Sequence, residues 1–277
     1  MLNSEQIRHF HQFGYVFLKE LYSASEIELF KDQIPDLLKH RDERVVMEKS
    51  GKAVRSIYGV HESNSILGAL ARHQKLAQAA QELLNGSVYV YQSKINIKDA
   101  FDGDVWDWHQ DYIYWKNEDG MPSSSVLTAA LFLDDITEFN SPVIMIPGSH
   151  RHGVTSVDVL NGKPSEYQNG PAWISNLTAR LKYTVDRGTL ADQVNKNGMV
   201  AEKGRAGSVL FFDGNVIHAS QPNISPHSRT LLLYTYNRVD NAPPPTALHR
   251  PNFLASRNST PIQLLSSDIR ELAPNLL

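Results

Sequence analysis

The sequence predicts an α+β fold in which N-terminal helices flank an antiparallel sandwich or barrel. Apolar residues recur at helical spacing in the first 85 residues, whereas short β-branched and aromatic runs follow Gly86. Helices followed by many short strands are typical of α+β domains with an antiparallel centre. With 277 residues, of which 41% are hydrophobic, we expect residues 1–277 to form one domain.

The first 85 residues are expected to form a helical support for the sheet. Helical spacing predicts three helices, over residues 4–12, 25–38 and 74–84. In the second helix, Ser25 and Glu28 make a candidate capping box, and Pro35 is expected to introduce a kink.

The strands define the core and the segments that surround it. Six runs predict strands: residues 14–19, 87–97, 126–135, 143–148, 207–214 and 230–239. We therefore place the core at residues 86–245, with a C-terminal tail at 246–277. Residues 151–200 are rich in glycine, proline and polar side chains and are expected to form a lid-like insertion. The segment NEDGMP at 117–122 is expected to be a solvated turn.

Composition limits the classes of ligand and metal site. The 27 basic and 30 acidic residues are mixed along the chain, which argues against nucleic acid or an anionic membrane as partner and favours a small-molecule substrate. The absence of cysteine excludes disulfides and thiolate metal sites, so any metal must bind to His, Asp or Glu. No signal-peptide or membrane-spanning run is visible, and we expect a cytoplasmic monomer or homodimer.

The stretch WDWHQDYIYW, residues 106–115, contains a candidate metal-binding pair. In an extended chain the side chains of His109 and Asp111 point to the same face. A third ligand, His218, is available in FFDGNVIHAS at the end of a predicted strand. Two histidines and one carboxylate on one face are typical of non-haem Fe(II) oxygenases, while zinc more often takes three ligands and a water in tetrahedral geometry.

The pattern also permits a purely structural interpretation. His109 could be a core histidine among aromatic rings, with Asp111 as its hydrogen-bond partner. A rival pair with the same spacing, His150 and His152, follows a Pro-Gly turn and is the weaker candidate for metal binding.

A predicted hairpin returns Arg229 to the neighbourhood of His218. The connection is rich in proline and asparagine, and the next strand begins at Arg229. A buried arginine requires a counter-charge, which the far carboxylate of a dicarboxylate cosubstrate would supply, with Ser220 as a further donor. The alternative is that Arg229 lies on the surface or forms a structural ion pair.

Several motifs spread over most of the chain indicate a family. They are FHQFGYVFL, AVRSIYGVHE, YQSKINIK, WHQDYIYWKNEDGMP, IPGSHRHG, and FFDGNVIHASQPN with Arg229. With them the sequence resembles the phytanoyl-CoA dioxygenase family of Fe(II)/2-oxoglutarate oxygenases, in particular a bacterial branch similar to the ectoine and 2-aminoethylphosphonate hydroxylases.

The resemblance implies a double-stranded β-helix (jelly-roll, cupin-like) core and the cofactors Fe(II), 2-oxoglutarate and O₂. The site residues that it implies are the metal ligands His109, Asp111 and His218, and the cosubstrate-binding residues Arg229, Ser220, Gln92 and Asn96. The expected reaction is hydroxylation of an unactivated C–H bond of a small polar or zwitterionic metabolite, with succinate and CO₂ as products.

The substrate pocket departs from the ectoine hydroxylases that the sequence resembles. Lys94 stands where those enzymes have arginine, Leu233 where they have phenylalanine, and Ser141 where the family usually has glycine. A lysine at position 94 would suit a phosphonate as a point charge.

Aromatic and apolar residues near the metal motifs are candidates for the wall that holds the substrate. These are Tyr112, Trp115, Phe212 and Leu233, beside Lys94. Rings at strand spacing also occur as ordinary core. Two other functions stay open: a zinc or manganese enzyme on the same three ligands, and a non-catalytic ligand-binding jelly-roll protein.

Overall fold

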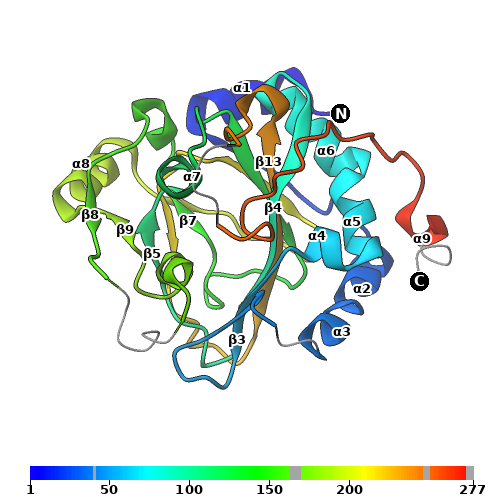
Figure 1. Cartoon of the computed structure of the whole chain (residues 1–277), viewed down its shortest axis with the longest axis horizontal. Coiled ribbons are helices and arrows are strands. Elements are labelled where there is room, and N and C mark those ends of the chain that lie inside the picture. The colour runs from blue at the N-terminus through cyan, green and yellow to red at the C-terminus, as the bar shows by residue number, and fades with distance from the viewer. Residues whose placement is uncertain (40–41, 163–169, 246–249, 273–277) are drawn as a thin grey trace.

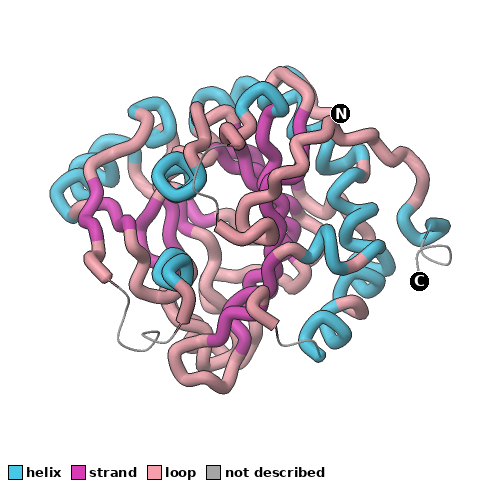
Figure 2. Tube along the Cα trace, viewed as in Figure 1, coloured by secondary structure: helices cyan, strands magenta, loops and turns pink. Residues whose placement is uncertain are grey.

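Two antiparallel sheets form the centre of the computed structural model, which describes residues 1–39, 42–162, 170–245 and 250–272 (Figures 1 and 2). The larger sheet has the order β1 (Tyr15–Leu18), β11 (Val209–Asp213), β6 (Val126–Phe132), β13 (Arg229–Arg238), β4 (Val88–Lys98), β3 (Val54–Tyr58), β2 (Val45–Met47). The smaller has the order β10 (Val200–Ala201), β7 (Ile144–Met145), β12 (His218–Ser220), β5 (Trp106–His109). Side chains of both sheets line one cavity, as expected of a jelly roll.

Helices from the N-terminal third cover the outer face of the larger sheet, on the right in Figure 1. The helices before β4 are α1 (Ser4–Phe13), α2 (Ala24–Lys31), α3 (Ile34–Lys39), α4 (Val60–Ser63), α5 (Ser65–Arg72) and α6 (Gln74–Leu84). Buried hydroxyls join the two layers, since Tyr234 donates to the carbonyl of Leu67 and Tyr236 to that of Ala71, each at 2.8 Å. The helices of this segment therefore pack against the larger sheet, and its role as a support stays a prediction.

The second predicted helix is wrong in two respects. Its capping box consists of Ser23 and Glu26, not Ser25 and Glu28. The helix is also divided, because α2 ends at Lys31 and α3 starts at Ile34. Pro35 falls in the first turn of α3, where its missing N–H is tolerated.

The insertion at 151–200 packs beside the smaller sheet. Its strands β8 (Val157–Val159) and β9 (Tyr183–Val185) pair with each other, and α8 (Arg187–Asn197) follows them. Leu190 and Val194 of α8 pack against Ile146 and Ile217, next to β7 and β12. Residues 163–169 of the predicted lid lie outside the described residues, and the role as a lid stays a prediction.

The C-terminal tail returns to the centre of the molecule. The backbone N–H of Ser256 donates to the carbonyl of Tyr91 on β4 at 2.9 Å, and the orange-to-red segment in Figure 1 follows this path to α9 (Ile269–Leu272). Residues 246–249 and 273–277 of the predicted tail lie outside the described residues. No helix in the described part of the chain is both long and apolar enough to span a bilayer.

Candidate metal centre and cofactor pocket

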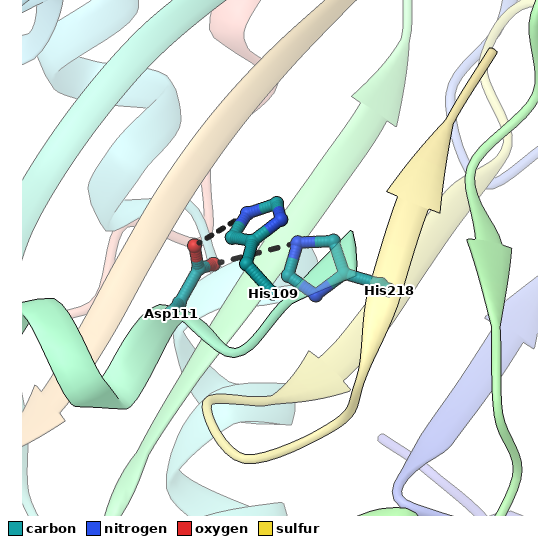
Figure 3. Close-up of side chains that lie close together, drawn as sticks. All are labelled: His109, Asp111 and His218. Carbon is teal, nitrogen blue, oxygen red and sulfur yellow. Dashed lines mark ion pairs between the residues drawn. The ribbon is translucent and has the colours of Figure 1, made fainter. Parts of the chain in front are cut away.

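Three side chains converge between the two sheets (Figure 3). The Nε2 atom of His109 lies 3.5 Å from Oδ1 of Asp111, and Nε2 of His218 lies 4.0 Å from Oδ2 of the same carboxylate. One donor atom from each residue lies within 4.8 Å of the others. Among the described residues, this is the one such group of three or more His, Asp or Glu, so the structure brings the predicted ligands together.

Strand pairing explains why residues so distant in sequence meet. Strand β12 pairs antiparallel with β5, and His218 stands directly opposite His109. The pairing shifts register between His218 and Ser220, whose partner on β5 is Trp106. A bulge of this kind places an extra residue on β5, so Trp106 and His109, three positions apart, can both line the cavity.

The route by which Asp111 reaches the site differs from the prediction. Strand β5 ends at His109, and Asp111 is the first residue of helix α7 (Asp111–Asp119), so the two side chains do not share the face of an extended strand. The aromatic run after Asp111 is helical and is buried on several sides. The carboxylate nevertheless lies beside the two imidazoles (Figure 3), because helix α7 starts only two residues after His109 ends β5.

Backbone carbonyls orient both imidazoles. Nδ1 of His109 donates to the carbonyl of Asp107 at 2.6 Å, and Nδ1 of His218 donates to that of Val216 at 3.0 Å. A carbonyl only accepts hydrogen bonds, so each Nδ1 carries the proton and each Nε2 presents a lone pair to the centre. Such outer hydrogen bonds are usual for histidines that bind metals.

The protonation states also suit a cation. Burial and the neighbouring His109 lower the pKa of His218 to about 4, so its imidazole is neutral near pH 7. Burial alone would raise the pKa of Asp111, but the charge that His218 and His109 carry when protonated, together with the Lys94 ammonium, lowers it well below its usual range. One carboxylate and two neutral imidazoles are a donor set suited to a divalent transition metal.

Gln110, between two of the candidate ligands, is buried and fully hydrogen-bonded. Its Nε2 donates to the carbonyls of Gly153 at 2.8 Å and Asn215 at 2.6 Å, while its Oε1 accepts from the backbone N–H of Thr155 at 2.9 Å. These bonds tie the turn that carries His109 and Asp111 to two other segments. The sequence contained no signal for this role.

A buried guanidinium lies in the wall of the same cavity. Arg229 is 1% exposed and donates to two neutral oxygens: Nε donates to the carbonyl of Ser141 at 3.1 Å and Nη1 to Oδ1 of Asn96 at 3.4 Å. No carboxylate in the described ranges forms an ion pair with it. Burial and the nearby Arg55 lower its pKa to about 9, so it remains charged at pH 7. An acid bound there would complete the charge pair.

Ser141, which stands where glycine is usual, contributes to this arrangement. Its φ of 70° lies in the left-handed region that favours glycine. The serine hydroxyl donates to the carbonyl of Gln221, and its own carbonyl accepts from Arg229. The serine therefore links the loop after β6 to the loop after β12, next to the guanidinium.

A second basic side chain, Lys98, is buried beside Arg229. Its amine donates to the carbonyls of Ser220, at 3.3 Å, and Gln221. Burial, with repulsion from Arg229 and Arg55, lowers the pKa of Lys98 from 10.5 to about 6. A lysine at the end of a predicted strand would ordinarily be solvated, and the sequence did not single it out.

The depressed pKa of Lys98 predicts a pH dependence of stability. Between about pH 6 and 10.5 the unfolded chain binds one more proton at this amine than the folded chain, so stability rises with pH in this window. We expect the unfolding free energy of the wild type to rise with pH relative to that of Lys98→Met, by ~1 kcal/mol per pH unit. Urea denaturation at several values from about pH 6.5 to 8.5 measures this. A difference independent of pH would contradict it, and Lys52→Met, at an exposed lysine, is the control with no expected trend.

Trp106 is a cavity residue that the sequence did not assign. Its ring lines the cavity, the guanidinium of Arg55 lies 3.8 Å from its centroid, and the ammonium of Lys94 lies 5.3 Å from it. Arg55 is itself held by Glu48 at 3.1 Å and by the carbonyl of Leu177 at 3.1 Å. The indole N–H is buried without a hydrogen-bond partner among the described residues. Two cations therefore contact the same ring, and both contacts are favourable cation–π interactions.

The other residues predicted from the sequence divide into two groups. Those that line the cavity are Lys94, Asn96, His109, Phe212, His218, Ser220, Arg229 and Leu233. Asp111, Gln92, Tyr112 and Trp115 are not among the lining residues. The amide of Gln92 donates to the carbonyl of Leu254 at 2.6 Å, and Tyr112 and Trp115 belong to an aromatic cluster beside α7. Their helical setting turns these two rings away from the cavity.

One further expectation needs correction. Residues 117–119 end helix α7 instead of forming a solvated turn, and Asp119 is 0% exposed. The rival pair His150 and His152 lies in a short 3₁₀ helix, where Nε2 of His150 contacts the carbonyl of His11 at 3.1 Å.

A jelly roll that brings two histidines and one carboxylate together beside a buried guanidinium has the features of the non-haem metal oxygenases. The family model described as Phytanoyl-CoA dioxygenase (PhyH) matches residues 10–231. The chain belongs to this family, which confirms the resemblance predicted from its motifs.

Curated relatives and solved structures agree with this assignment. The chain is 34% identical over 255 residues to L-proline trans-4-hydroxylase of Streptomyces griseoviridis, covering 92% of this chain and 93% of the relative. It is 34% identical over 265 residues to ectoine dioxygenase of Bordetella parapertussis, covering 93% and 83%. EctD from S. alaskensis, solved with 2-oxoglutarate and 5-hydroxyectoine, matches with a TM-score of 0.81 at 29% identity over 97% of this chain and 89% of that chain.

Proposed function

We propose that the protein is an Fe(II)- and 2-oxoglutarate-dependent dioxygenase that hydroxylates an unactivated C–H bond of a small polar or zwitterionic metabolite. The observation that carries the proposal is the meeting of His109, Asp111 and His218 in a cavity whose wall contains the buried Arg229. The relatives named above are hydroxylases or dioxygenases of small metabolites, which supports the same class of reaction.

The three converging side chains would hold Fe(II). When bound, iron and 2-oxoglutarate supply the oxidising chemistry, in which O₂ is consumed and 2-oxoglutarate is converted to succinate and CO₂. The chain orients the two Nε2 lone pairs through the carbonyls of Asp107 and Val216, and it keeps the Asp111 carboxylate ionised. The neighbouring Phe212 ring, 4.9 Å from that of His218, helps to exclude water.

Arg229 and Ser220 would bind the far carboxylate of 2-oxoglutarate, and Asn96 would hold the guanidinium in place. All three line the cavity. Arg229 donates to two neutral oxygens, so its charge is still available for an acid. Its planar fork can form two charge-assisted hydrogen bonds with the far carboxylate of the cosubstrate.

Lys94 would bind an acidic group of the substrate. Its side chain lines the cavity, and its ammonium is close enough to the Asp111 carboxylate to lower the pKa of that group. Because Arg229 would already pair with the far carboxylate of the cosubstrate, the charge of Lys94 remains for the substrate. This favours an amino acid, an ectoine-like carboxylate or a 2-aminoethylphosphonate-like zwitterion, with Phe212 and Leu233 as the apolar wall.

A succinate-release screen tests the proposal. Metal-loaded protein is assayed with 2-oxoglutarate and each of ectoine, L-proline and 2-aminoethylphosphonate, and we expect at least one anionic or zwitterionic compound to stimulate succinate formation. With that compound, Lys94→Met should raise KM for the substrate by ~10- to 100-fold, the value of one charged hydrogen bond, while KM for 2-oxoglutarate changes less than about threefold. Lys94→Arg is the charge-retaining control. An unchanged substrate KM in Lys94→Met would show that the lysine is misassigned.

The zinc or manganese alternative makes a different prediction. Such an enzyme would have no dicarboxylate cosubstrate to pair with Arg229, so binding of 2-oxoglutarate by the purified, metal-loaded protein separates the two functions. A cytoplasmic location and a monomeric or homodimeric state stay predictions from the sequence.

A further inference from the structure

A buried ion pair holds the end of helix α7 that is farthest from the metal centre. The helix begins with Asp111 and ends with Asp119, whose carboxylate is 0% exposed. Nε of Arg250 donates to Oδ1 of Asp119 at 3.0 Å, and Nη2 donates to Oδ2 at 2.6 Å. The hydroxyl of Tyr91 also donates to Oδ2. The pair is therefore bidentate, nearly free of solvent and completed by a third donor.

Arg250 belongs to the C-terminal tail, which is fastened to the cavity-lining strand β4. The amide of Gln92 donates to the carbonyl of Leu254 at 2.6 Å, and the backbone N–H of Ser256 donates to the carbonyl of Tyr91 at 2.9 Å. Two residues beyond Gln92, the same strand contributes Lys94 to the cavity. The tail thus joins β4 to the end of α7.

Further contacts hold the rest of α7. At its start, the backbone N–H of Tyr112 donates to the carbonyl of Gly214 at 2.9 Å. In its middle, the hydroxyl of Tyr114 donates to the carbonyl of Tyr183 at 2.8 Å and accepts from the N–H of the same residue at 3.1 Å. The helix is therefore held at its start, its middle and its end.

Of these anchors, the ion pair at the end of α7 is the one whose loss would cost the most free energy. An α-helix of this length behaves as a short rod, about 12 Å from its first to its last residue. A shift along the rod would separate Asp119 from Arg250 and leave a charge buried without its partner, which is strongly unfavourable. The same shift would displace the Asp111 carboxylate from the two imidazoles.

We propose that the ion pair of Asp119 and Arg250, completed by Tyr91, positions Asp111 for metal binding. These are positioning residues, because none of them contacts the metal centre. Through this ion pair the C-terminal tail supports the metal site without contacting it. This inference rests on the proposed function, in that Asp111 is taken to be a metal ligand.

A titration of the metal-free protein with Co(II), followed by visible absorption, tests the proposal without any turnover. Asp119→Asn keeps the size of the side chain and removes its charge. At a temperature where circular dichroism shows the variant to be folded, we expect it to bind Co(II) ~10-fold more weakly than the wild type, at the lower end of the range for residues outside the ligand shell. The absorption bands should also change shape, because the carboxylate ligand would be misplaced.

A pair of tyrosine variants provides a matched comparison. Tyr91→Phe removes the buried hydroxyl that donates to Asp119, whereas Tyr236→Phe removes a buried hydroxyl that donates to Ala71 on the helical side of the sheet. Both variants should lose similar stability, of ~1 kcal/mol. Only Tyr91→Phe should weaken Co(II) binding. We expect a ~3-fold effect, because the Tyr91 hydroxyl is one of three donors to the Asp119 carboxylate.

The following results would count against the proposal. If folded Asp119→Asn binds Co(II) within twofold of the wild type, the ion pair does not position Asp111. If Asp119→Asn does not fold, equal Co(II) affinities of Tyr91→Phe and Tyr236→Phe overturn the proposal instead. If Asp111→Ala itself retains wild-type Co(II) affinity, both the ligand assignment and this inference are wrong. Loss of binding in Asp111→Ala without any loss in Asp119→Asn overturns this inference alone.

Discussion

Replacing Asp111 with alanine is expected to abolish succinate formation while leaving the fold intact. The carboxylate is the single anionic member of the candidate metal centre, lying 3.5 Å from Nε2 of His109 and 4.0 Å from Nε2 of His218. Without it two neutral imidazoles remain, and the loss should exceed the ~100-fold effect that residues outside the ligand shell can have on metal affinity. Succinate release and iron content of the purified variant measure this effect.

The fold should survive because the other anchors of α7 do not involve the Asp111 side chain. Circular dichroism and thermal unfolding of Asp111→Ala should therefore resemble those of the wild type. Asp158→Ala, at an exposed aspartate of β8, is the control and should release succinate at the wild-type rate. If Asp111→Ala retains turnover, the three-residue centre has to be abandoned.

Replacing Arg229 with alanine is expected to raise the requirement for 2-oxoglutarate by ~100-fold or more. Removing one partner of a buried charge pair typically costs several kcal/mol of binding free energy. The guanidinium is 1% exposed, and an acid bound beside it would be well shielded from water. The affinity for iron should change by less than about threefold, since Arg229 is not among the residues whose donor atoms converge.

Arg229→Lys separates the effect of charge from that of shape. Lysine keeps a positive charge but loses the planar fork, so the 2-oxoglutarate requirement should fall between those of the wild type and Arg229→Ala. The measurement is the apparent KM for 2-oxoglutarate at saturating iron. If it is unchanged in Arg229→Ala, Arg229 does not bind the cosubstrate.

The sequence predicted the metal residues but not the way in which the chain presents them. His218 was placed at the end of a predicted strand and His109 in an extended segment, and local conformations of this kind are what sequence pattern indicates best. Asp111 was expected to extend the strand, because i, i+2 spacing favours a shared face. Its aromatic neighbours Tyr112 and Trp115 were placed in the cavity wall because they lie near the metal motif. A helix that starts within two residues of a strand end leaves no hydrophobic period long enough to detect.

The residues that the sequence missed depend on contacts between distant segments. In the sequence, Asp119 lies in a segment typical of a polar turn. Only its pairing with Arg250, 131 residues later, explains its burial. Lys98 ends a strand where lysine is usually solvated, and its burial follows from the loops that close over it. Trp106 shares its wall with His109 because of an irregular pairing, which a regular alternation of faces does not anticipate.

The pairing of β12 with β5 has a consequence for how the protein matures. His218 follows Asp111 by 107 residues, so a growing polypeptide carries only two of the three ligands until most of it has left the ribosome. Iron loading is therefore a late event in biosynthesis. Translation products that stop before β12 should be unable to acquire a complete centre, however well their earlier strands have folded.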